Sequence, residues 1–183
     1  MSHPSLNAVY QHLQQWIEEF LSVGHPHFAG LSPCPFSRQA WIEHRVHVQP
    51  CQGDDLEAQL LQIAQNWCDR HDVYILANLG DHPLPNLEQR VDALNYQLGQ
   101  NDVVALVDSP HNPATSLSHT NTSNQKYVLI LLQRLSHLQA ASRKLAQTGY
   151  YDNWTAVDFR NLVDWRSKLL PRQEDEAETN PFP

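Results

Sequence analysis

The chain has 183 residues, which suits one domain with a substantial core. It carries 20 acidic residues against 12 Lys and Arg, a formal net charge of −8 at pH 7 with its 11 histidines counted as neutral. Because a duplex-binding surface requires clustered cations, this balance disfavours a nucleic-acid partner. We expect a single globular domain over residues 1–170 and an acidic, disordered tail over residues 171–183.

The N-terminal residues lack the cationic start and apolar core of a signal peptide, and no apolar run approaches the roughly 20 residues that span a bilayer. We therefore expect a cytoplasmic protein without a membrane contact. The three cysteines, Cys34, Cys51 and Cys68, are too scattered for a disulfide framework or a metal knuckle, and this fits a reducing compartment.

The N-terminal half of the chain predicts helix, loop, strand and helix. Apolar residues recur at helical spacing from Ser5 to Val23, and a loop rich in Pro and Gly follows Gly24. The alternation from Trp41 to Gln49 is typical of a strand. It would place Glu43, Arg45 and His47 on the face opposite His44. A second helix opens at Gly53.

The remaining elements alternate in the same way. Short apolar runs at 73–77 and 103–107 predict strands, with a helix capped by Asn86 between them. A polar loop spans 108–124. The run 127–132 predicts a fourth strand that leads into a helix ending at Gly149, although one long helix from Asn124 is the competing interpretation. A capping box at Thr155 begins the last helix.

This order, β-α-β-α-β-loop-β-α with an extra helix at each end, predicts an α/β (α+β) fold with a ferredoxin-like four-stranded sheet. Three of the strands are apolar on both faces, so a second layer must cover the sheet. The added helices are one candidate for this layer, and a second copy of the chain in a homodimer is the other.

A resemblance comes from the segment Leu31-Ser-Pro-Cys-Pro-Phe-Ser-Arg38, which follows a helix and precedes a strand. It resembles an uncharacterised bacterial family of small proteins, a domain of unknown function, with the motif C-P-F-[AS]-[KR]. The likeness covers about residues 10–145. Where that family has an Asn-Arg-Ser-Pro turn and a His-Pro-Asp turn, this chain has Asn121-Thr-Ser-Asn and Ser109-Pro-His. The resemblance implies no activity.

Cys34 is the first candidate catalytic residue, since a rigid Pro-flanked loop with Arg38 nearby can lower a thiol pKa. The string Cys-Pro-Phe-Ser also resembles the monothiol site of glutaredoxin-like proteins and omega-class glutathione transferases. In those proteins the motif lies between a strand and a helix, however, whereas here it follows a helix. A reactive thiol, a thiol that lines a site and a buried packing cysteine all stay open.

Histidine is unusually frequent, and a metal site is possible although the histidine spacing does not signal one. His25 and His27 flank Pro26, while His44 and His47 are three apart and would point to opposite faces of a strand. His47, with Arg45 beside it, would instead offer a base and an anion partner if its face lines a pocket.

We expect the C-P-F loop (residues 31–38) and the 109–124 loop to meet over the sheet around a small polar or carboxylated molecule. An enzyme that tailors or isomerises this molecule by His/Arg acid–base chemistry is favoured. The alternatives are a metal- or haem-binding protein, a thiol-redox or glutathione-type enzyme, and a non-catalytic binding or assembly protein. The cofactor stays unknown. The candidate catalytic residues are Cys34, His47 and His111; the candidate substrate-binding residues are Arg38, Arg45, Ser109, Asn121 and Ser123.

Overall fold

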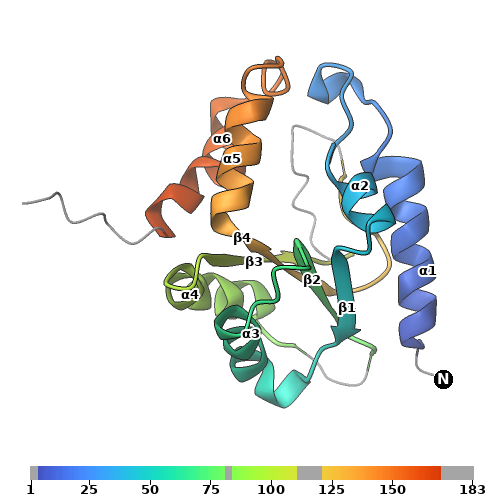
Figure 1. Cartoon of the computed structure of the whole chain (residues 1–183), viewed down its shortest axis with the longest axis vertical. Coiled ribbons are helices and arrows are strands. Elements are labelled where there is room, and N and C mark those ends of the chain that lie inside the picture. The colour runs from blue at the N-terminus through green and yellow to red at the C-terminus, as the bar shows by residue number, and fades with distance from the viewer. Residues whose placement is uncertain (1–3, 81–83, 111–120, 170–183) are drawn as a thin grey trace, which may run out of the picture.

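The computed structural model describes residues 4–80, 84–110 and 121–169, and it shows a mixed α/β fold (Figure 1). Four strands form one sheet in the order β1-β2-β4-β3. Strand β4 lies antiparallel between β2 and β3, whereas β1 and β2 are parallel neighbours. The strands are β1 (Val46–Pro50), β2 (Val73–Ala77), β3 (Val103–Asp108) and β4 (Leu129–Arg134).

Four strands occur in the predicted order along the chain, although the first begins later than predicted. The segment after Asn124 forms β4 and then α5 (Leu135–Leu145), so the single long helix considered as its alternative is wrong. The ferredoxin-like assignment is not confirmed. That fold follows a β-α-β-β-α-β order, whereas here β1, β2 and β3 run in one direction and the last strand inserts between two of them.

One face of the sheet packs against α3 (Leu56–Gln65) and α4 (Leu87–Gly99). The side chains of Leu60 and Leu98 are fully buried there. The buried Asn95 of α4 donates through Nδ2 to the Ala105 carbonyl at 3.0 Å and accepts from the Ala105 N–H at 2.8 Å. This amide therefore satisfies both backbone groups at one position of the edge strand β3.

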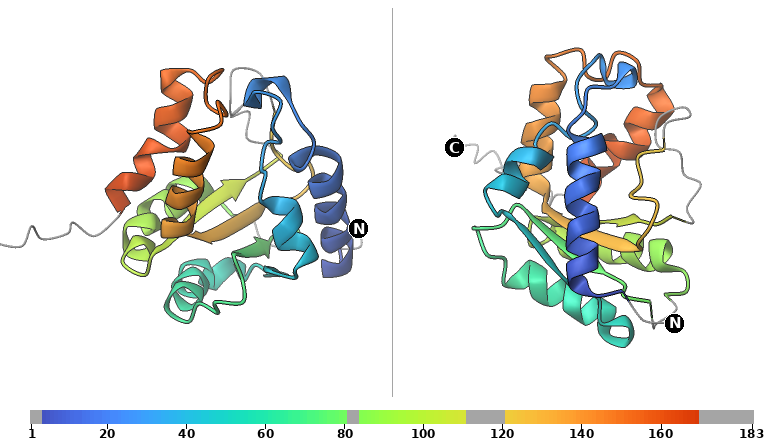
Figure 2. Two further views of the ribbon diagram at one scale, coloured as in Figure 1. Left: turned by 45° about the horizontal axis from the view of Figure 1, so that its top comes forward. Right: turned by 90° about the vertical axis from the view of Figure 1, so that its right-hand side faces the viewer.

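The second face is covered by the added helices, as the apolar strands predict (Figure 2). Helix α1 (Leu6–Trp16) continues as a π-helix over Ile17–Leu21 and buries its apolar stripe against β2 and β4. At the β3 end, α5 and the 3₁₀ helix Asp164–Leu169 complete the layer. Helix α6 (Ala156–Leu162) begins with the predicted capping box, in which Thr155 and Asp158 bond reciprocally.

The strand predicted over 41–49 is wrong in its first half. Residues Ser37–Ile42 form a short helix, α2, and β1 begins only at Val46. Trp41 is buried against the second sheet face because it packs from the helix rather than from a strand. His44 has a φ of 55° in the turn between them. The end of α2 and the turn that follows it therefore show the same alternation of apolar and polar residues as a strand.

The cap of α4, the search for membrane-spanning helices and the tail can also be compared with the sequence predictions. Asn86 stands at the N-cap of α4, but its φ of 53° is left-handed and its side chain makes no capping bond. Within the described residues, no helix is long and apolar enough to cross a membrane. The tail predicted over residues 171–183 lies outside the described residues.

Candidate functional site

Cys34 and His47 lie on opposite sides of the sheet. In β1, Val46 and Val48 pack toward α1, so His47 between them faces α3, in register with Tyr74 of β2. The Cys34 N–H instead donates to the Leu21 carbonyl at the end of the π-helix, at 3.0 Å. The structure therefore does not unite these two candidates. The third, His111, lies outside the described residues.

The predicted substrate-binding cations are also separated. Arg38 is exposed on α2. Arg45 forms ion pairs with Glu43 at 2.8 Å and with Asp72 at 3.0 Å. Because two carboxylates already compensate its charge, Arg45 stabilises the turn before β1 rather than offering a free anion site.

Hydrogen bonds between Asp108 and Asn124 join the two ends of the predicted loop after β3. Asp108 Oδ2 accepts from the backbone N–H of Asn124 at 3.0 Å and from its Nδ2 at 2.8 Å. His12 Nε2 lies 2.9 Å from the Asn124 carbonyl oxygen, which ties this closure to α1. Burial raises the pKa of Asp108.

The remaining loop candidates lie beside this closure. Asn121 Oδ1 accepts from the Ser123 N–H at 2.9 Å, a local turn contact. Ser109 follows β3 directly and is half-buried. These contacts run to β3 and to the middle of α1, whereas the C-P-F loop bonds to the end of the π-helix. The meeting of the two loops therefore stays a prediction.

The C-P-F loop joins the helices near the C-terminus instead. Tyr150, in the turn after α5, donates its hydroxyl to the Pro33 carbonyl at 2.6 Å. Ser37 Oγ donates to the Cys34 carbonyl at 2.8 Å. Burial raises the pKa of the Cys34 thiol, and this effect exceeds the lowering by hydrogen bonds from Phe36 and Ser37. This raised pKa disfavours the thiolate form that a nucleophilic cysteine needs.

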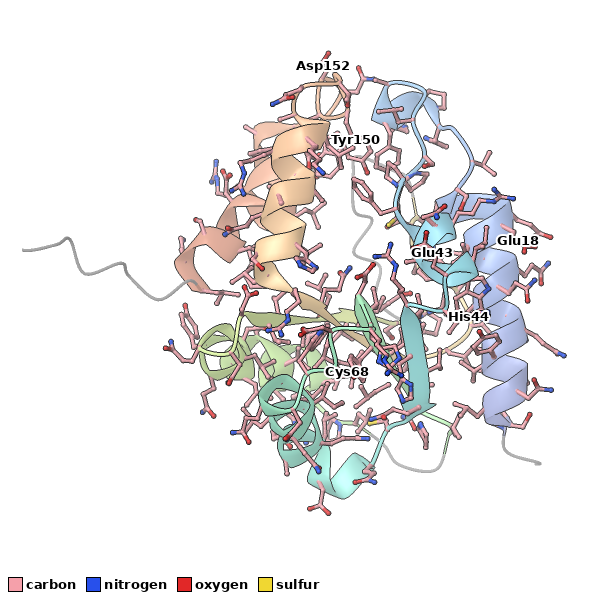
Figure 3. All side chains as sticks on the ribbon, in the orientation of Figure 1. Glu18, Glu43, His44, Cys68, Tyr150 and Asp152 are labelled. Atoms are coloured by element: carbon pink, nitrogen blue, oxygen red, sulfur yellow. The ribbon has the colours of Figure 1, made fainter. Side chains whose placement is uncertain are left out.

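A set of aromatic rings continues from Tyr150, which Figure 3 shows at the end of α5 near the short helix Pro26–Phe28. Phe28 and Tyr150 are buried, with ring centroids 5.1 Å apart. Tyr151 lies 5.0 Å from Tyr150 and 4.8 Å from Trp154. We call these rings the aromatic cluster: Phe28, Tyr150, Tyr151, Trp154 and Phe159.

Arg166 interacts electrostatically with Tyr151 of this cluster. One Nη group of Arg166 donates to the Leu162 carbonyl. Its Nε and the Trp154 Nε1 are both buried without a hydrogen-bond partner. Within the part of the chain that the structure describes, no carboxylate pairs with this guanidinium. Burial lowers the pKa of Arg166, and the nearby Tyr151 partly opposes this.

A second group of titratable side chains lies on the opposite sheet face. The ring centroids of His47 and His71 are 5.1 Å apart, and each lies near Tyr74. His71 Nδ1 is 3.1 Å from the Tyr74 hydroxyl. Burial, with smaller effects from His47 and Arg70, lowers the pKa of His71. Across residues 4–80, 84–110 and 121–169, no group of three or more potential metal ligands occurs.

Sequence reasoning missed both Arg166 and His71. Arg166 falls in a segment whose spacing indicates only an amphipathic helix, and nothing in that pattern reveals which cation lacks a counter-charge. His71 precedes β2 by two residues, so only knowledge that β1 and β2 are parallel neighbours could bring it to His47.

Comparisons of the chain with family models, with curated proteins and with solved structures each gave no match. The resemblance of the C-P-F segment to an uncharacterised bacterial family therefore stays a hypothesis.

Proposed function

We propose that the chain is a small-molecule-modifying enzyme that binds a carboxylated substrate beside the aromatic cluster, with Arg166 as the ion partner. The observation that carries this proposal is the buried Nε of Arg166, which has no carboxylate or hydrogen-bond acceptor among residues 4–80, 84–110 and 121–169. A cation withdrawn from water is unfavourable unless it is paired, so a missing counter-charge is itself a sign of an anionic ligand.

The surrounding groups suit such a ligand. A carboxylate can accept two parallel N–H bonds from one guanidinium, and these charge-assisted bonds are stronger than neutral ones. The Trp154 Nε1, which has no hydrogen-bond partner among the described residues, supplies a further donor. The Trp154 ring packs against Tyr151, and Tyr151 interacts electrostatically with Arg166. Aromatic rings give apolar contact for the rest of the molecule. Arg166 is half-buried as a whole residue, whereas its Nε atom is buried.

Two neutral groups, Cys34 and Tyr150, lie at the aromatic cluster. Burial raises the pKa values of both Cys34 and Tyr150, and the two groups interact electrostatically. Because the Tyr150 hydroxyl already donates to the Pro33 carbonyl, Tyr150 holds the C-P-F loop against the aromatic cluster and is not a free proton donor. The same raised thiol pKa argues against the thiol-redox and glutathione-type alternative, which needs a thiolate. Arg166 thus takes the role that the sequence suggested for Arg38 or Arg45.

Calorimetric titration with sodium benzoate tests the proposal, because benzoate combines a carboxylate with one aromatic ring. We expect binding to the wild type, at least tenfold weaker binding to Arg166→Gln, and unchanged binding to Arg160→Gln. Arg160 is a matched control because it is an exposed arginine on the preceding helix. Benzamide, which lacks the charge, is expected not to bind. Equal affinity of benzoate for wild type and Arg166→Gln would show that the carboxylate is not held by Arg166.

A further inference from the structure

We propose that His47 and His71 form a binding site for a divalent transition-metal ion, with Zn²⁺ as the expected occupant and water in the remaining coordination positions. This site lies on the sheet face that packs against α3, so it is independent of the function proposed around Arg166 on the other face.

The spacing of the two rings fits one shared ion. A zinc ion lies about 2.1 Å from a ligating ring nitrogen, which is itself about 1.1 Å from its ring centre, so two imidazoles on one ion have centres about 4.5 to 5.4 Å apart. The centroids of His47 and His71 are 5.1 Å apart, at an interplanar angle of 38°. Both residues are half-buried, which leaves a path from solvent.

The position of His71 is fixed by contacts on both sides of its backbone. Its N–H donates to the Cys68 carbonyl at 2.9 Å, and its carbonyl accepts from Trp67 Nε1 at 3.1 Å. The following residue, Asp72, donates its N–H to the Arg45 carbonyl at 2.7 Å, which sets the turn against the start of β1. Strand β1 therefore places His47, and backbone hydrogen bonds in the connection before β2 place His71.

Tyr74 provides the support that metal-binding histidines usually have. Such a histidine commonly uses its second ring nitrogen to bond a neighbouring oxygen, which fixes the tautomer and aims the other nitrogen at the ion. The Tyr74 hydroxyl lies 3.1 Å from His71 Nδ1, and the Cys68 N–H donates to the same oxygen at 3.4 Å. Nε2 of His71 is then the nitrogen left for a metal.

A second histidine pair supplies an internal comparison. His25 and His27 have centroids 5.2 Å apart, but their rings are stacked at 16°. The Nδ1 of His25 also accepts the His27 N–H at 3.3 Å, so one nitrogen of this pair is already engaged by the backbone. The two histidine pairs have similar centroid distances but different interplanar angles, so His27→Ala is a matched control.

Calorimetric titration of the full chain with ZnCl₂ tests the site. We expect His47→Ala and His71→Ala each to weaken Zn²⁺ binding at least tenfold, and His27→Ala to leave it unchanged. Tyr74→Phe, which keeps the ring but removes the hydroxyl, should weaken binding about tenfold, the lower end of the range for supporting groups. Arg70→Gln should tighten binding, because it removes a cation next to His71.

A spectroscopic measurement covers the case in which an alanine variant fails to fold. With Cu²⁺ as the probe, the electron paramagnetic resonance spectrum of the wild type should show two coordinated imidazole nitrogens, and Tyr74→Phe should perturb it. Zn²⁺ binding that persists in folded His47→Ala and His71→Ala, or that is lost in His27→Ala, would overturn the proposal. A Cu²⁺ spectrum without coordinated imidazole would do the same.

Discussion

Replacing Arg166 with Met should make the ligand-free protein more stable while it removes carboxylate binding. Breaking the hydrogen bond to Leu162 costs about 1 to 2 kcal/mol, whereas removing a half-buried, unpaired cation recovers several kcal/mol of desolvation, and the long Met side chain keeps the apolar contacts. We expect Arg166→Met to exceed the wild type by about 1 kcal/mol in free energy of unfolding.

Benzoate should reverse this order. At 100 times its dissociation constant, a ligand that binds only the folded state adds about 2.7 kcal/mol to stability. Wild type should then exceed Arg166→Met by about 1.7 kcal/mol, because the variant gains nothing. The control Arg160→Met should stay within about 0.5 kcal/mol of wild type in both conditions.

Urea unfolding followed by tryptophan fluorescence, with and without benzoate, measures these differences. The reasoning is refuted if ligand-free Arg166→Met is less stable than the wild type by 1 kcal/mol or more, because the guanidinium would then already have a favourable structural role. It is equally refuted if benzoate stabilises the variant as much as the wild type.

Three further predictions concern the fold and the thiol. Asn95→Leu should lower the free energy of unfolding by about 2 to 4 kcal/mol in urea unfolding, because it leaves both backbone groups of Ala105 unpaired; a loss below 1 kcal/mol would contradict this. Glu57 has a lowered pKa, chiefly through its hydrogen bond from Arg90, so the pair should stabilise the fold above the ordinary Glu pKa and lose this effect as pH falls through the folded-state pKa. Arg90→Met should thus cost about 0.5 kcal/mol at pH 7, discounted for solvent exposure, and nothing at pH 2; an equal cost at both pH values would refute the pairing. Cys34 should react with iodoacetamide at pH 7.5 more slowly than a free cysteine, and mass spectrometry showing faster labelling would indicate a thiolate.

The strands and main helices could be predicted because their signals are local. The run Val73–Ala77 is apolar throughout and lies between the two helical layers. The Thr155 capping box sets the start of α6 through contacts within one turn. The need for a second covering layer also followed from strand composition, and α1 meets it.

The arrangement of the candidate site could not be predicted in the same way. The prediction of which side chains in residues 41–47 share a face assumed a strand beginning near Trp41. The end of a helix and a turn with a left-handed residue precede the strand there instead. The proximity of His71 to His47 requires the parallel pairing of β1 and β2, which short apolar runs do not encode. The missing counter-charge of Arg166 depends on which side chains surround it in three dimensions.

The central claim is that Arg166 and the Trp154 indole bind a carboxylate together, and the indole region of a ¹⁵N–¹H correlation spectrum tests it most directly. The chain has five tryptophans, and Trp154→Phe assigns the signal of interest. We predict that benzoate shifts the Trp154 Nε1–H signal in wild type, that benzamide does not, and that Arg166→Gln abolishes the shift. An unmoved Trp154 signal at benzoate concentrations that saturate binding, or an equal shift in Arg166→Gln, would contradict the account.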